Sequence, residues 1–193
     1  MICLLENFSS SGHLKKVTIH SALISFLVDI NEAKTVAELI SVHSSNIIQN
    51  ITQKIGHLSL IRNKNSPFRM LVAFLEMALP QDFVRFVPSF VRSLNKFTDQ
   101  YYLDDTTGSI EVALKLYLRT SEFLRQTIEA DEKLVLDTLK TSNLLRQMLM
   151  RIKPFILSSD KKMSFYSIQI LRSTFPVLAS TLICDITAAN VIF

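Results

Sequence analysis

Apolar residues recur every three or four positions along most of this chain, which is the spacing of one face of an α-helix. The clearest stripe follows Ser66-Pro67 and consists of Phe68, Leu71, Val72, Leu75 and Leu79. Serine suits a helix cap and proline suits the first helical turn, so a helix is predicted from this pair to a stop at Pro80. A second stripe of Met70, Phe74 and Met77 predicts burial on more than one side.

The next stretch, DFVRFVPSFVRSLNKF from residue 82 to residue 97, repeats Phe-Val-Arg with a spacing of seven residues. Seven residues are close to two helical turns, so Phe83, Phe90 and Phe97 are predicted to stack on one face of a single helix. Pro88 lies well inside that expected helix, where it removes one hydrogen bond and bends the axis.

Three further helices are predicted downstream. They run from Gly108-Ser109 to about Ala130, from Asp131 through Ile152 to a break near Pro154, and from Asp160 to Pro176. The first of them has apolar positions on two sides. The last carries Phe165, Ile168, Leu171 and Phe175 as its apolar positions.

The N-terminal third, residues 1–65, is less regular. A helix is expected near Leu14 to Val28, and Asn31-Glu32 opens another with acidic charge at its positive end. Residues 44–56 either continue that helix or form a separate one. We therefore expect an all-α chain of seven to eight antiparallel helices, forming a single domain over residues 1–193.

Glycine usage supports the helical prediction, because Gly12, Gly56 and Gly108 are the whole supply. A Rossmann or P-loop site needs glycine at its tight turn and is excluded. Helices with two apolar stripes, arranged in antiparallel pairs, suit a stacked α-solenoid, whereas a closed bundle needs only one stripe per helix. Over about residues 66–180 the pattern resembles HEAT or armadillo-like helical-repeat proteins, which implies a short solenoid that presents a surface to a partner.

Charge singles out one candidate surface. The 21 Lys and Arg residues exceed the 17 Asp and Glu residues and give a formal charge of +4. Arg85, Arg92 and Lys96, called the cationic strip below, flank the phenylalanines of the repeated triplet. They are either solvated edges of a buried helix or a strip that faces an acidic peptide or a phosphate backbone.

No catalytic or metal-ligating constellation is found in the sequence. The four histidines lack a ligand partner at helical spacing, no GxSxG motif is present, and Cys3 and Cys184 stand at opposite ends without a CxxC motif. We expect no enzyme activity, no cofactor and no metal. Two internal runs without charge, residues 17–28 and 173–184, have twelve residues each, whereas a membrane-spanning helix needs about 20.

The function expected from these patterns is a non-enzymatic scaffold or adaptor that binds a partner protein, in a hetero-complex or a homodimer. One alternative is a nucleic-acid-associated helical protein that uses the cationic strip. The other is a compact Bcl-2-like bundle around residues 134–152. The cysteine usage and the lack of a secretory signal pattern favour the cytoplasm or nucleus. The apolar ending AANVIF suggests a fragment or an end that a partner covers.

Overall fold

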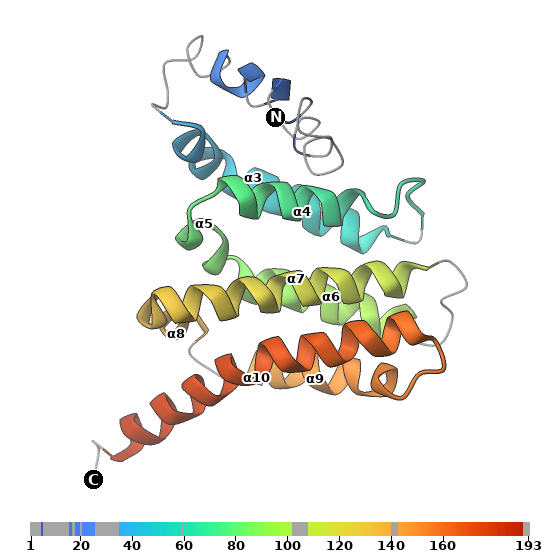
Figure 1. Ribbon diagram of the computed structural model, residues 1–193, viewed down its shortest axis with the longest axis vertical. Coiled ribbons are helices and arrows are strands. Elements are labelled where there is room, and N and C mark those ends of the chain that lie inside the picture. Colours follow the sequence, from blue (N-terminus) through green and yellow to red (C-terminus); the bar gives the residue numbers. More distant parts are fainter. Residues whose placement is uncertain are drawn as a thin grey trace. The chain divides into compact units, whose positions relative to one another are not determined.

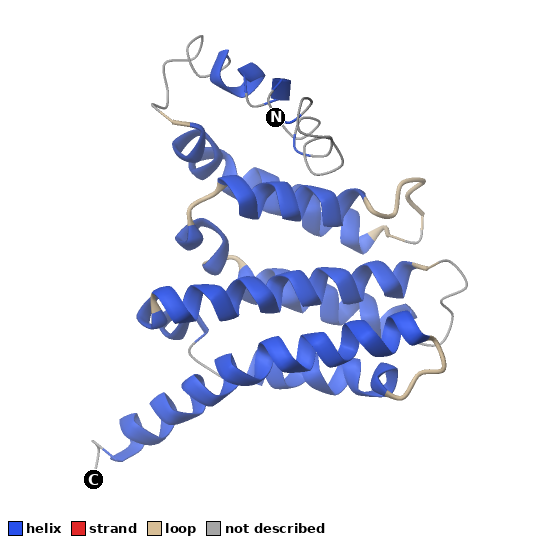
Figure 2. Cartoon of the chain, viewed as in Figure 1, coloured by secondary structure: helices blue, strands red, loops and turns tan. Residues whose placement is uncertain are grey.

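The computed structural model describes residues 5, 16, 18–19, 21–25, 35–58, 60–101, 108–139 and 143–190, without the side chains of 101, 136–139 and 181–190. Within these ranges the regular backbone is helical and no strand occurs (Figure 2). The all-α prediction is confirmed. Every described residue between Leu14 and Val28 is helical, whereas the helix start expected at Asn31-Glu32 lies outside the described residues.

Figure 1 labels the helices whose bounds are described. They are α3 (Val36–Gly56), α4 (Ser66–Met77), α5 (Pro80–Val84), α6 (Val87–Tyr101), α7 (Ser109–Ala130), α8 (Glu132–Leu139), α9 (Asn143–Ile156) and α10 (Lys161–Asn190). The chain divides into two compact units, residues 1–83 and 84–193. The single-domain organisation stays a prediction.

In the first unit α3 and α4 pack as a helical hairpin. Helix α3 begins after Thr35, whose hydroxyl accepts a hydrogen bond from the backbone N–H of Glu38 at 3.1 Å and caps the helix. At the other end of α3, the Lys54 ammonium donates to Ser66 Oγ at 3.0 Å, which ties the hairpin together. Helix α4 is buried or half-buried except at Glu76, as its two apolar stripes predict.

The second unit contains two helical hairpins, α6–α7 and α9–α10, joined through α8. Helix α7 packs against α10 and α6 packs against α9, so corresponding helices of the two hairpins lie side by side. Figure 1 shows that α7 and α10 run in the same direction and that α6 and α9 run in the opposite one. An up-down-up-down four-helix bundle would instead place antiparallel helices at every side-by-side contact.

Helix α7 lies at the centre of this unit, where it packs against α6, α8 and α10. It starts after Gly108, whose φ of 68° favours glycine because other residues rarely adopt this left-handed region. Its exposed residues are confined to the last turns, at Gln126, Glu129 and Ala130. The predicted bounds and the predicted two-sided burial of this helix are confirmed.

The prediction of a single bent helix from Asp82 to Phe97 is wrong. Helix α5 ends at Val84 and α6 begins at Val87, so Phe83 lies on a different helix from Phe90 and Phe97. Pro88 is the second residue of α6, where the N–H of any residue would lack an intrahelical acceptor. The proline therefore starts a helix here and does not bend one.

Two other helix boundaries also differ from prediction. The helix expected from Asp131 to Ile152 is two helices, α8 and α9, and the side chain of Asp131 accepts from the N–H of Leu134 at 3.1 Å at the start of α8. Pro154 lies inside α9 and Pro176 lies inside α10, and each helix continues beyond its proline. Residues 134–152 are thus divided between α8 and α9.

Candidate protein-binding surface

The three residues of the cationic strip are exposed. Arg92 and Lys96 are four residues apart on α6 and therefore share one face. Arg85 lies in the turn before α6, where its guanidinium stacks over the ring of Phe86 at 4.8 Å from the ring centre. The strip is therefore split between a helix and a turn and is less regular than its seven-residue spacing predicts.

A larger feature lies on α10. Four large apolar residues of this helix are exposed and are called the apolar stripe below. Their exposed fractions are 56% for Phe165, 47% for Ile168, 38% for Leu171 and 67% for Phe175. Their spacing of three and four residues places them on one side of the helix. The structure places these four apolar positions outward.

The face of α10 that packs inward is built mainly from smaller side chains. Its buried residues are Ser167, Ile170, Ser173, Thr174, Val177 and Leu178. Thr174 Oγ1 donates to Ser121 Oγ of α7 at 3.0 Å, and Ser121 in turn donates to the carbonyl of Tyr117 at 2.9 Å. Small residues at this contact let α10 pack on α7 without the four large apolar side chains, which remain available to another molecule.

Exposed cations lie on the same hairpin as the apolar stripe. Lys153 of α9 and Lys161, Lys162 and Arg172 of α10 are exposed, and none of them forms an ion pair with a described side chain. Two more large apolar residues of the same hairpin, Met150 and Leu157, are 67% and 92% exposed. The hairpin α9–α10 thus combines exposed apolar surface with positive charge.

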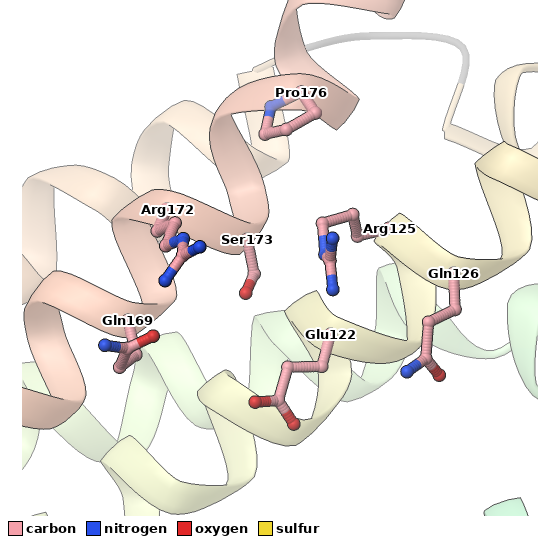
Figure 3. A pocket seen from close by; sticks show the side chains of 7 residues that line it. All are labelled: Glu122, Arg125, Gln126, Gln169, Arg172, Ser173 and Pro176. Atoms are coloured by element: carbon pink, nitrogen blue, oxygen red, sulfur yellow. The ribbon is translucent and has the colours of Figure 1, made fainter.

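A polar groove of about 530 Å³ lies beside the stripe, between α7 and α10. It is lined by Glu122, Arg125 and Gln126 of α7 and by Gln169, Arg172, Ser173 and Pro176 of α10 (Figure 3). Arg125 and Ser173 extend into the space between the two helices. Arg125 pairs with Glu129 at 3.3 Å and Arg119 with Glu122 at 3.6 Å, while Arg172 has no described carboxylate partner.

The buried phenol of Tyr117 has hydrogen-bond partners within the second unit. Tyr117 of α7 donates its phenol proton to Asn95 Oδ1 of α6 at 2.7 Å and lies 3.3 Å from the hydroxyl of Thr98. Burial raises the pKa of Tyr117 well above its ordinary value, although the Thr98 hydrogen bond and Arg151 act in the opposite direction. This phenol holds α6 and α7 together and has no access to a substrate.

The described residues contain neither a cluster of metal ligands nor a helix that could span a membrane. No group of three or more His, Cys, Asp or Glu side chains is placed to hold a metal ion in that part of the chain. No described helix combines the length and the apolar character needed to cross a bilayer. No protein-family model, curated protein or solved structure matches the sequence or the fold.

Proposed function

We propose that the chain is a non-enzymatic interaction scaffold that binds a partner protein through the apolar stripe of α10. The observation that carries the proposal is the exposure of four large apolar side chains on one helix face. Contiguous exposed apolar surface in a folded protein commonly marks an interaction site. The non-enzymatic part rests on the sequence, in which no nucleophile–base pair or ligand spacing occurs.

The scaffold proposed here is a short helical repeat of the HEAT or armadillo kind. Its support is the arrangement of α6–α7 and α9–α10, whose corresponding helices pack side by side and run in the same direction. In a helical-repeat array each hairpin covers the next, and an uncovered terminal hairpin exposes apolar residues. The proposal also places the scaffold in the cytoplasm or nucleus, from its cysteine usage.

Affinity capture with matched variants tests this function. The bait is the complete chain, compared with Phe175→Asp on the stripe and with Arg85→Glu, Arg92→Glu and Lys96→Glu combined on the cationic strip. Proteins that bind through the stripe are lost with Phe175→Asp and retained with the strip variant, while circular dichroism shows both variants equally helical. Partners lost only with the strip variant would move the proposed interface to α6, and equal capture by all three baits would reject both surfaces.

A second candidate function is nucleic-acid association through the cationic strip. It is favoured by the exposure of Arg92 and Lys96 on one face of α6, neither of which forms an ion pair with a described residue. Binding of a DNA or RNA duplex by this strip would fall steeply as salt rises, because phosphate contacts release counterions. Absence of duplex binding at low salt would reject this candidate without affecting the first.

A further inference from the structure

The apolar stripe is long enough to bind one partner helix, and this binding site is called the seat below. Three stripe residues share a line of positions with two cations. The line runs in alternating steps of four and three residues through Lys161, Phe165, Ile168, Arg172 and Phe175, which is the spacing of a helix–helix seam. The eleven residues from Phe165 to Phe175 are separated by ten steps of 1.5 Å and therefore extend over about 15 Å. A partner helix of three to four turns would cover this length.

Charge determines what kind of helix fits there. Lys161 and Arg172 lie within the seam, and Lys153 and Lys162 are exposed on the same hairpin without a described carboxylate partner. A partner that brings carboxylates next to the seam would pair these cations, whereas a partner with cations would be repelled.

The polar groove borders the seat along one side, so the two sides of the seat differ in polarity. Arg172 and Pro176 belong to the groove and lie next to the stripe, so the groove runs along one side of the seam. Arg172 and Arg125 both line it, and the exposed Arg125–Glu129 pair is of the weak kind that can be exchanged. The groove side of the seat therefore suits the acidic side chains of the partner.

We infer that the apolar stripe of α10 binds an amphipathic helix with an apolar seam and glutamate or aspartate residues along the side that faces Arg172. This inference rests on the function proposed above and names the chemistry of the partner. A second copy of this chain fits less well, because it would bring Lys161 and Arg172 against the same cations. A bilayer fits less well, because a flat surface leaves the recessed polar groove unfilled.

Three synthetic peptides of 18 residues can test the inference by fluorescence anisotropy against the complete chain. All three carry leucines at helix–helix spacing, and their flanking positions are occupied by glutamate, glutamine or lysine. The glutamate peptide should bind about tenfold more tightly than the glutamine peptide, and the lysine peptide more weakly than both.

Variants of the chain locate the binding and separate charge from apolar contact. Arg172→Glu should weaken the glutamate peptide about tenfold and strengthen the lysine peptide, because it reverses the charge at a seam position that also lines the groove. Phe175→Ala should weaken every peptide that binds. Lys133→Glu reverses an exposed cation on α8, outside the stripe and the groove, and should leave all affinities unchanged.

Several results would overturn the inference. Equal affinity for the glutamate and glutamine peptides would remove the acidic preference and leave the proposed interaction function intact. Binding of vesicles with anionic lipid that Phe175→Ala abolishes would replace the helix by a membrane surface. Dimerisation in analytical ultracentrifugation that Phe175→Ala abolishes would replace it by a second copy. Failure of all three peptides to bind would reject the seat for a helix.

Discussion

The two hairpins of the second unit use the same architecture and differ in how much of their apolar surface is covered. Among the described residues no large apolar side chain of α6–α7 is exposed, whereas Met150 of α9 and the four stripe residues of α10 are. Helices α7 and α10 hold the same position in their hairpins and pack against each other. On α10 one face packs against α7 and α9, whereas no described residue covers the face that carries the stripe.

A matched pair of leucine truncations gives the largest expected difference between the two helices. Leu116 of α7 is fully buried and Leu171 of α10 is 38% exposed. Leu116→Ala should lower the free energy of unfolding by about 2 to 5 kcal/mol, because it loses apolar burial and leaves a cavity. Leu171→Ala should lower it by roughly 1 kcal/mol or less, because much of its surface is already in water.

Urea unfolding followed by circular dichroism measures both truncations under the same conditions. If Leu171→Ala proved as destabilising as Leu116→Ala, the stripe would be part of the folding core in solution. The contrast between the two hairpins would then fail, and with it the reason to look for a partner on α10.

The bounds of the covered helix α7 were predicted well from the sequence. The bounds of α7 follow from two local signals, since Gly108 supplies the left-handed residue before the helix and Asp131 caps the helix after it. The break before α6 was missed because two copies of Phe-Val-Arg match a continuous helix. Pro88 fits the first turn of a new helix equally well, and periodicity alone does not choose between these positions.

The exposed stripe could not be recognised from its residues, because large apolar side chains at helical spacing normally mark the core. The indication lay on the opposite face, where Ser167, Ser173 and Thr174 are small enough for close packing against α7. Which of two apolar faces becomes buried depends on where the neighbouring helices lie. That is a property of the tertiary structure and not of the segment.

The next prediction concerns the buried tyrosine of the covered hairpin. Tyr117→Phe removes the proton that Asn95 Oδ1 accepts and leaves a buried oxygen without this donor. The cost should be about 1 to 3 kcal/mol of unfolding free energy. Tyr166→Phe on α10 is the matched control, because this tyrosine is only half-buried, and its cost should stay within about 0.5 kcal/mol.

Alkaline titration gives the Tyr117 prediction a second measurement. Burial raises the pKa of Tyr117 above its usual value of roughly 10, so the folded protein holds the phenol proton more tightly than the unfolded chain. The resulting stability is fully present below about pH 10 and is lost as the pH rises further. Tyr117→Phe should lose less stability than the unchanged protein over that range, and an identical loss would contradict this assignment.

The smallest expected effects concern two side-chain contacts between the hairpins, one partly exposed and one buried. Arg151 of α9 forms a bidentate ion pair with Asp99 of α6, at 2.8 Å from Nε to Oδ1 and 2.7 Å from Nη2 to Oδ2. On the other side, Thr174 of α10 bonds Ser121 of α7 in the interior at 3.0 Å. The ion pair is partly exposed and therefore sensitive to salt, whereas the buried hydroxyl pair is not.

Two double-mutant cycles with alanine test this difference. For Arg151 and Asp99 the coupling energy should be about 0.5 to 1 kcal/mol at low salt and should decrease towards zero at 1 M salt. For Thr174 and Ser121 it should be of similar size, about 0.5 to 1.5 kcal/mol, and should not change with salt. If both couplings decreased together, water would reach the α7–α10 contact, and α10 would be held too loosely to present a fixed stripe to a partner.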